Sequence, residues 1–369
     1  MSGVTSAASS AASASAPSAA SASAPSAASA SAPSAARVVA VGETMAMMRS
    51  GTIGSLAHLP SVDISLGGAE SNLAIGLRRL DVPVAWVSRV GDDPLGTRVM
   101  REIRAEGVEV HCAVDPTRPT GLMLKSRPSG TTTRVDYYRA GSAASALTPD
   151  DLPAGLIEQA QILHLSGITP LLSETAHATN VAAVQRAVAA GVQISLDVNY
   201  RSRLGSRELL AERLGEILEH VDIVFGGPEE LSILTPAAGG AGAGGAGAAA
   251  DSDEVDESDH RALLRALEAD GRQVIVKLGA DGGAALADGA ILEAPGHRVD
   301  VVDTVGAGDA FVAGYLSAQL DGLDVAARLA RANACGALAC TTPGDWEGAP
   351  RRSDLETLLA GGAADPVIR

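Results

Sequence analysis

Residues 303–314 constrain the fold more than any other stretch of the chain, because they join a strand-like run to an apolar helix through a glycine-bearing turn. The β-prone run is at 298–302, and the apolar helical run is at 310–320. The first N–H groups of a helix have no intrahelical partners, and together with the helix dipole they attract anions. The segment therefore predicts an anion-binding turn at the start of a helix.

The residues of this turn fit phosphoryl transfer. Gly306, Ala307 and Gly308 have little bulk, so a phosphate can approach their backbone closely. Asp309 follows in the first helical turn, where its carboxylate would lie beside that phosphate. A carboxylate next to an anion site suits a general base that takes a proton from a hydroxyl while the anion site holds the transferring group.

A simpler interpretation is that Asp309 caps the helix and that the glycines make a tight turn. Capping needs one polar residue, whereas this segment also carries Asp303, Thr304 and two glycines. The segment is not a dinucleotide-binding fingerprint, because Phe311 stands at the position of the third glycine. It is not a Walker A loop either, because it lacks Gly-Lys-Ser/Thr.

Strand-like and helix-like runs alternate along the rest of the chain, which predicts an α/β fold with a parallel sheet covered on both faces. Ligands of such sheets bind at the carboxyl ends of the strands. The expected strands are at 38–41, 84–88, 192–201 and 221–225, with a strand leading into a loop at 162–170 and a strand and glycine-bearing turn at 274–283; the expected helices are at 73–80, 94–106, 310–320 and 325–340.

Three segments fall outside this pattern. Residues 1–36 repeat Ser-Ala-Ala-Ser-Ala-Ser-Ala-Pro and lack core-forming side chains, so we expect a disordered tail. It has neither the apolar stretch of a signal peptide nor the arginines of a transit peptide. Residues 236–259 combine an Ala/Gly run with an acidic run, which predicts a solvated insertion. With a short C-terminal tail at 363–369, this leaves 37–362 as the folded domain.

Composition excludes several classes of partner. The net charge of −16 argues against nucleic acid and anionic membranes. The three cysteines have no metal-ligand spacing, and no apolar run is long enough to span a membrane. We therefore expect a reducing, cytoplasmic location and small-molecule ligands.

Two segments near opposite ends of the chain resemble the signatures of the ribokinase-like (PfkB) family of sugar kinases. One is 303–314; the other runs from Gly67-Gly68 and Asn72 to residues 89–96. The resemblance implies a three-layer α/β/α sandwich with a mostly parallel central sheet and a small β-sheet lid over the sugar. It also implies that Gly68 and Asn72 contact sugar hydroxyls, and that ATP and Mg²⁺ are the cofactors.

The lid is expected from β-prone runs near 43–66 and 110–139. Tyr137 and Arg139 would face the substrate or the hinge of the lid. Because side chains alternate along a strand, one of Tyr137 and Tyr138 should point to the pocket and the other away.

The middle of the chain resembles one subgroup, the 2-keto-3-deoxygluconate kinases, at 137–142, 162–170, 192–201 and 344–349. The substrate of that subgroup is a sugar acid, and a carboxylate suits a planar guanidinium donor. Arg139 and Arg201 are the candidates; the alternative for each is a surface or ion-paired arginine. The resemblance also places Ile168 and Asp345 at the substrate.

The nucleotide half is implied by the same family. Glu230 would order a water on Mg²⁺, although Gly227 replaces the asparagine of the family motif. Asn333 would lie near the adenine. Met123 and Trp346 also depart from relatives and could alter sugar preference, whereas His164 in an apolar strand is expected to be a core residue. The residues expected to border the ATP phosphates and ribose are Lys277, Gly279, Ala280, Gly282, Gly306 and Gly308.

These observations predict an ATP-dependent kinase that phosphorylates the terminal hydroxyl of 2-keto-3-deoxy-D-gluconate, with Asp309 as base. A fructokinase or ribokinase-like kinase of another sugar is the nearest alternative, and a non-catalytic sugar or nucleotide sensor is a more distant one. We further expect a homo-oligomer that binds neither nucleic acid nor membrane.

Overall fold

The computed structural model describes residues 36–129, 132–235, 257–268, 272–287 and 289–359. The predicted tails and most of the predicted insertion lie outside these residues. Two predicted boundaries are wrong by a few residues. Ala36 is buried in the core, and helix α6 (Glu257–Leu267) begins inside the predicted insertion because Leu263, Leu264 and Leu267 pack into the core at helical spacing.

The central layer is a nine-stranded sheet in the order β13-β12-β11-β10-β9-β8-β1-β4-β5. Neighbours pair in parallel from β5 to β11, whereas β12 and β13 add an antiparallel edge. The strands are β1 (Val38–Val41), β4 (Val84–Gly91), β5 (Glu109–Asp115), β8 (Ile162–Ser166), β9 (Gln193–Asp197), β10 (Ile223–Gly226), β11 (Gln273–Lys277), β12 (Gly283–Ala287) and β13 (Ala290–Ala294).

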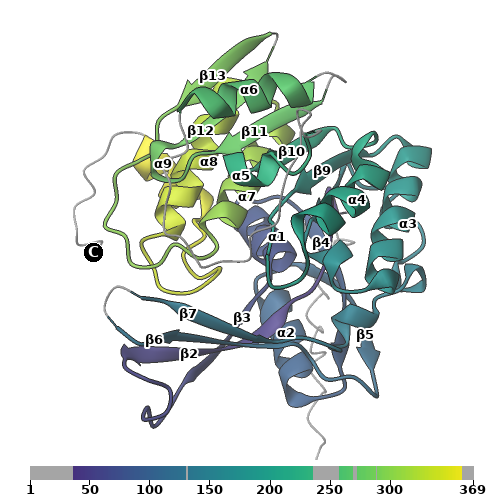
Figure 1. Ribbon diagram of the computed structural model, residues 1–369, viewed down its shortest axis with the longest axis vertical. Coiled ribbons are helices and arrows are strands. Elements are labelled where there is room, and N and C mark those ends of the chain that lie inside the picture. The colour runs from purple at the N-terminus through teal and green to yellow at the C-terminus, as the bar shows by residue number, and fades with distance from the viewer. Residues whose placement is uncertain (1–35, 130–131, 236–256, 269–271, 288, 360–369) are drawn as a thin grey trace, which may run out of the picture. The chain divides into compact units, whose positions relative to one another are not determined.

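Apolar residues on both faces of each central strand explain why helices cover the sheet on two sides (Figure 1). In β1, Val39 and Val41 belong to one core, whereas Val38 and Ala40 belong to the other. The first core packs against α3, α4 and α6, and the second against α1, α2, α7 and α8. The helices are α1 (Ala69–Arg79), α2 (Pro94–Ala105), α3 (Glu174–Ala190), α4 (Arg207–Leu218), α5 (Pro228–Leu231), α7 (Ala307–Leu320), α8 (Val325–Ala339) and α9 (Arg352–Leu359).

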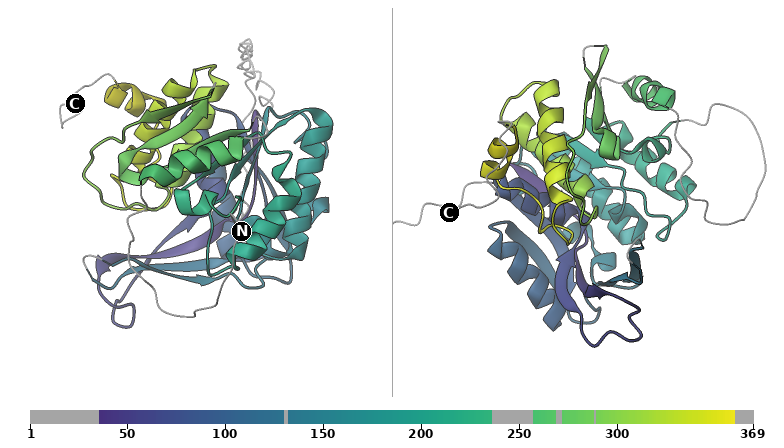
Figure 2. Two further views of the ribbon diagram at one scale, coloured as in Figure 1. Left: turned by 45° about the horizontal axis from the view of Figure 1, so that its top comes forward. Right: turned by 90° about the vertical axis from the view of Figure 1, so that its left-hand side faces the viewer.

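A second, four-stranded sheet projects away from the first (Figures 1 and 2), in the order β3-β2-β6-β7. Its strands are β2 (Met45–Ile53), β3 (Asp63–Gly67), β6 (Leu122–Arg127) and β7 (Arg134–Tyr138). The chain enters this sheet twice, at Glu43 and Thr44 shortly after β1 and again before β6, and it leaves twice, after β3 at Gly67 and after β7 at Arg139. Two separate segments of the chain, β2 with β3 and β6 with β7, therefore build the predicted lid.

Two sequence predictions about strands are corrected. Residues 109–115 form β5 at the edge of the central sheet and are not part of the lid, whose second segment begins only at β6. Residues 298–302 form no strand: Val301 and Val302 are half-exposed, and β13 ends the sheet on that side. A β-prone run becomes a strand only where the fold lays it beside a partner strand, whereas here the N–H groups of Val302 and Asp303 donate to the Cys340 carbonyl at the end of α8, at 2.8 and 3.2 Å.

Among the described residues, no helix combines the length and the apolar character that crossing a bilayer requires.

Candidate active site

A cavity of about 740 Å³ lies between the carboxyl ends of the central strands and the small sheet. Most residues predicted for the site line it. These are Gly68, Asn72, Tyr137, Arg139, Ile168, Arg201, Glu230, Lys277, Gly306, Gly308, Asp309 and Asp345. The predicted residues that do not line it are Ala307, Gly279, Ala280, Gly282 and Asn333.

The turn before α7 has the geometry of an anion site. Gly306 caps the helix with a left-handed φ of 78°, and a Cβ there would lie 1.6 Å from the carbonyl oxygen of Asp345. The Ala307 N–H donates to the Thr304 carbonyl at 3.3 Å. Within the described residues the N–H groups of Gly306, Gly308 and Asp309 have no hydrogen-bond partner, so they can receive an anion.

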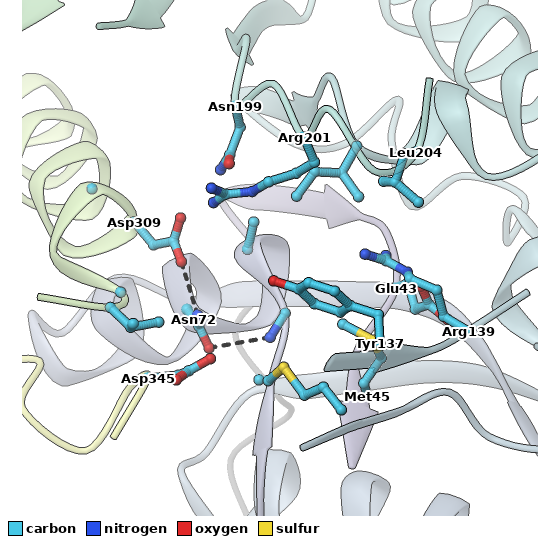
Figure 3. A pocket seen from close by; sticks show the side chains of 18 of the residues that line it. Glu43, Met45, Asn72, Tyr137, Arg139, Asn199, Arg201, Leu204, Asp309 and Asp345 are labelled. Atoms are coloured by element: carbon cyan, nitrogen blue, oxygen red, sulfur yellow. Dashed lines mark hydrogen bonds and ion pairs between the residues drawn. The ribbon is translucent and has the colours of Figure 1, made fainter. Parts of the chain in front are cut away.

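Asp309 is held beside this turn by Asn72 of α1. The Asn72 side-chain amide donates to Asp309 Oδ2 at 2.8 Å (Figure 3). Burial raises the pKa of Asp309 to about 7; the Asn72 hydrogen bond opposes this, and the nearby Asp197 carboxylate adds to it. A carboxyl with a pKa near neutrality is suited to general-base chemistry.

Lys277, at the end of β11, belongs to a second charged cluster close to the same turn: a Cβ at Gly308 would lie 3.6 Å from its Nζ. Its ammonium group donates to both carboxylate oxygens of Asp197, at 2.7 and 2.9 Å, and lies 3.9 Å from Glu230. Burial lowers the pKa of Lys277, but the attraction of Asp197 and Glu230 outweighs burial and leaves that pKa above its usual value. Lys277 therefore stays charged and could bind a phosphate.

Glu230 is oriented by backbone N–H groups. Gly227 and Tyr200 donate to its two carboxylate oxygens at 2.8 and 3.1 Å. The described residues contain no group of three or more His, Cys, Asp or Glu that could hold a metal. Mg²⁺ is commonly held by one or two carboxylates, waters and substrate phosphates, so Glu230 fits a Mg²⁺ that arrives with a nucleotide.

The two candidate arginines differ sharply. Arg139 donates to the fully buried carboxylate of Glu43, with an Nε–Oε2 distance of 2.7 Å, and its side chain is 9% exposed. Arg139 is therefore an ion-paired arginine at the rim of the lid, which was the alternative to a substrate-binding role. The guanidinium of Arg201 has no hydrogen bond or ion pair within the described residues, and it points across the cavity toward Asp309 (Figure 3). Arg203, nearby, donates to the Val135 carbonyl of the lid at 3.2 Å.

The lid residues follow the predicted alternation. Tyr137 lines the cavity, whereas Tyr138 does not and is 62% exposed. Met123 lines the cavity floor and packs with Met45 and Met47. Trp346 lies outside the cavity lining and stacks under the Arg79 guanidinium, 5.1 Å from its ring centroid.

Two of the residues predicted for the nucleotide half, Asn333 and Gly282, have a structural role outside the cavity lining. The Asn333 amide donates to the carbonyls of Ala294 and Pro295, at 2.8 and 3.1 Å. Gly282 has φ 103°, and a Cβ there would lie 2.1 Å from the Ala294 carbonyl oxygen.

His164 is buried, and its Nδ1 is hydrogen-bonded to the Ser195 hydroxyl at 3.0 Å, which confirms that it is a core residue.

Sequence reasoning missed several residues of the site. Glu43, Asp197 and Asn199 each follow or end a buried central strand, so their position at a strand's carboxyl end was a usable signal. Asn199 lines the cavity with a left-handed φ of 40°, which is unusual outside glycine and recurs at functional sites. Lys125 was also missed; it is one of two lysines in the chain.

Comparisons with known proteins show which sequences and folds the chain is similar to. The sequence profile of the pfkB family carbohydrate kinases matches residues 35–352. The chain is 35% identical over 329 residues to the 2-dehydro-3-deoxygluconokinase of Bacillus subtilis (strain 168), covering 87% of this chain and 95% of the relative. It is 32% identical over 328 residues to the 2-dehydro-3-deoxygalactonokinase of Haloferax volcanii, covering 89% and 98%. A candidate ribokinase II from E. coli, crystallised with ATP and Mg²⁺, matches with a TM-score of 0.75 and 25% identity, covering 89% of this chain and 100% of that chain.

Proposed function

We propose that this chain, which belongs to the pfkB family of carbohydrate kinases, transfers the γ-phosphoryl group of ATP to the terminal hydroxyl of 2-keto-3-deoxy-D-gluconate. Family membership makes it a phosphotransferase that acts on a sugar hydroxyl, and it confirms the predicted ribokinase-like fold and enzyme class. The sugar acid, the nucleotide and the metal are the proposal.

The step that we propose uses Asp309 as base. The carboxylate takes the proton of the sugar hydroxyl while that oxygen forms a bond to the γ-phosphorus. The bond from the γ-phosphorus to the bridging oxygen of ADP breaks, and ADP leaves with that electron pair. The N–H groups of Gly306 and Gly308 would hold the phosphoryl oxygens, and Lys277 would bind the phosphate chain. Mg²⁺ bound with the nucleotide would neutralise phosphate charge, with Glu230 as its anchor through a water.

One observation carries the choice of a sugar acid, and it is the unpaired guanidinium of Arg201. The cavity is lined by Arg139, Arg201, Arg203 and Lys277. Arg139 is paired with Glu43, Arg203 binds the lid and Lys277 is paired with Asp197. Arg201 therefore has the free planar donor that a substrate carboxylate would pair with.

The test is a coupled ATPase assay across sugar acids and neutral sugars, with Arg201→Ala. A hydrogen bond to a charged group is worth about 1.5–3 kcal/mol, so the KM for the sugar acid should rise about ten-fold to a hundred-fold. Arg201→Lys should recover part of this, since an ammonium lacks the fork. Arg351→Ala removes an exposed arginine outside the cavity lining and should leave the KM unchanged.

The panel should include both 2-keto-3-deoxygluconate and its 4-epimer, because the relatives are named for each. Arg201→Ala should weaken both acids and leave any turnover of fructose or ribose nearly unaffected. Two outcomes would contradict the sugar-acid assignment: a wild-type enzyme that prefers a neutral sugar, or an Arg201→Ala enzyme that is equally impaired on neutral and acidic sugars. In either case the conclusion would be a sugar kinase without a preference for acids. Absence of ATP turnover with every sugar would favour the sensor. A cytoplasmic homo-oligomer stays a prediction.

A further inference from the structure

Lys125 is a buried lysine that the proposed reaction does not use. It lies on β6 of the lid, is 4% exposed and does not line the cavity. Its ammonium group points away from the small sheet and contacts the carboxylates of Asp303, before α7, and Asp345, after α8. The distance from Nζ to Asp303 Oδ2 is 2.6 Å, and that to Asp345 Oδ1 is 3.2 Å. A buried charge with this arrangement joins the lid to the loops that build the site.

Asp303 stands at the base of the anion-binding turn. One of its carboxylate oxygens accepts the Val305 N–H at 3.2 Å, and the other accepts the Gly344 N–H at 3.2 Å. It thereby links the turn before α7 to the loop after α8. These segments meet closely, since Gly306 leaves no room for a Cβ against the Asp345 carbonyl.

Asp345 forms part of the cavity wall, and the groups around it are mostly negative. Burial raises its pKa to about 6; Lys125 opposes this, and the Glu347 and Asp303 carboxylates add to it. Glu347 is itself bonded to Ser65 at 2.8 Å and lies 4.0 Å from Arg49, both residues of the lid. Arg79 reaches this loop through the backbone carbonyls of residues 346, 347 and 349. Lys125 is thus the cation in direct contact with the Asp345 carboxylate in the described part of the chain.

We propose that Lys125 is a positioning residue for sugar phosphorylation, whose ammonium group fixes Asp345 in the cavity wall and ties it, through Asp303, to the anion-binding turn. Lys125 acts through Asp345 and does not touch the sugar. The inference rests on the proposed function in that Asp345 must meet the sugar, but it requires only that the enzyme phosphorylates some sugar.

Lys125→Met removes the charge and keeps the apolar stem. With the sugar that the wild-type enzyme turns over best, its KM should rise about ten-fold to a hundred-fold, while the KM for ATP changes little. Lys125→Arg keeps a cation and should restore part of the loss. Arg127→Met removes an exposed charge from the same strand and should resemble wild type.

A pH series separates positioning from a structural role. Without the ammonium group, Asp345 should ionise at a higher pH, so the loss in Lys125→Met should be largest at about pH 6.5 and shrink toward about pH 9. Titration of Asp309 affects both enzymes and cancels in the ratio of their KM values. A Lys125→Met enzyme with the wild-type KM, or one with the same loss at both pH values, overturns the proposal.

A double variant keeps the test valid if Lys125→Met does not fold. Lys125→Met/Asp345→Asn removes the ammonium group together with one carboxylate charge, and it is compared with Asp345→Asn alone. Asp345→Asn keeps the contact from Lys125 to Asp303 and the double variant loses it, so any difference made by the anion-binding turn should appear in kcat, whereas the sugar KM values should agree within about threefold if Lys125 acts on the sugar through Asp345. A further tenfold rise in the double variant would overturn the proposal. These readouts use whichever sugar is turned over, so failure of the sugar-acid assignment is seen separately, in the wild-type substrate panel.

Discussion

At the residue scale the site depends on one carboxyl group with a perturbed pKa. Asp309 stands in the first turn of α7, beside unpaired N–H groups, and accepts a hydrogen bond from the side-chain amide of Asn72. Burial makes its ionised form costly, while the Asn72 hydrogen bond and the Arg201 and Lys277 charges favour that form. Balance between these effects keeps the group basic enough to accept a proton and ionised often enough to do so.

Replacing this base should remove turnover without removing the sugar. Asp309→Asn keeps the shape of the side chain but cannot accept the proton, so kcat should fall by roughly 10²–10⁴. Equilibrium binding of the sugar, measured by calorimetry, should change much less. A variant that keeps more than about a tenth of the wild-type kcat would exclude Asp309 as the base.

The pH profile tests the same group without a substitution. The folded-state pKa of Asp309 is raised to about 7, so the carboxyl is protonated and inactive below that pH and ionised above it. The value of kcat at saturating sugar should therefore increase as pH rises through about 7. Asn72→Ala removes the hydrogen bond that favours ionisation, and its profile should shift to higher pH. A kcat that is flat between about pH 6 and pH 8 would contradict this assignment.

At the element scale the lid is defined by where the chain crosses into it and out of it. Glu43 lies on the crossing from β1 to β2, and Arg139 lies just after β7. The two are ion-paired, and the Ser142 hydroxyl donates to Glu43 at 2.6 Å. The chain crosses between the large part and the lid four times, and one buried pair next to the cavity joins the first and the last of these crossings.

Breaking this pair should destabilise the protein. Arg139→Met would leave the buried Glu43 carboxylate without its cation, which costs about 3–5 kcal/mol in the free energy of unfolding. Adding Glu43→Gln removes the uncompensated charge and should recover part of that loss. Urea denaturation followed by circular dichroism measures both; a loss below about 1 kcal/mol in the single variant would show that the pair does not hold the hinge.

At the scale of the whole molecule, the net charge of the protein has the same sign as the charges of its proposed ligands. The net charge is −16, and both the proposed sugar acid and ATP are anions. The cavity lining does not reverse this sign: Arg139, Arg201, Arg203 and Lys277 are balanced by Glu43, Glu230, Asp309 and Asp345. Selection of an anion therefore depends on which cation is unpaired, and within the described residues that cation is Arg201, while the exterior repels other polyanions.

The low-complexity segments should be dispensable for catalysis. Residues 1–35 and 236–256 have compositions unsuited to a packed core, so deleting the first or shortening the second should leave Tm and kcat nearly unchanged. Differential scanning fluorimetry and steady-state kinetics on the two deletions provide the measurement. Loss of soluble, active enzyme would reveal a role in folding or assembly.

The sequence by itself determined the parts of this protein that are local in the chain. The glycine turn with Asp309 carries its own geometry, because a left-handed Gly306 and the free N–H groups of a helix start are set within a few residues. The alternation of buried strands and helices likewise predicted the α/β layers and the edge at which ligands bind. The sequence also predicted that Tyr137 and Tyr138 would face opposite ways.

Only the tertiary structure decided which charges are paired and which strands find a partner. Arg139 and Arg201 are alike in sequence, yet a buried Glu43 from a distant strand binds the first and nothing among the described residues binds the second. Lys125 meets carboxylates about two hundred residues away, so no local pattern could indicate its role. The β-prone run at 298–302 stayed irregular because strand formation depends on a partner strand alongside, and the fold instead places Val302 and Asp303 against the Cys340 carbonyl at the end of α8.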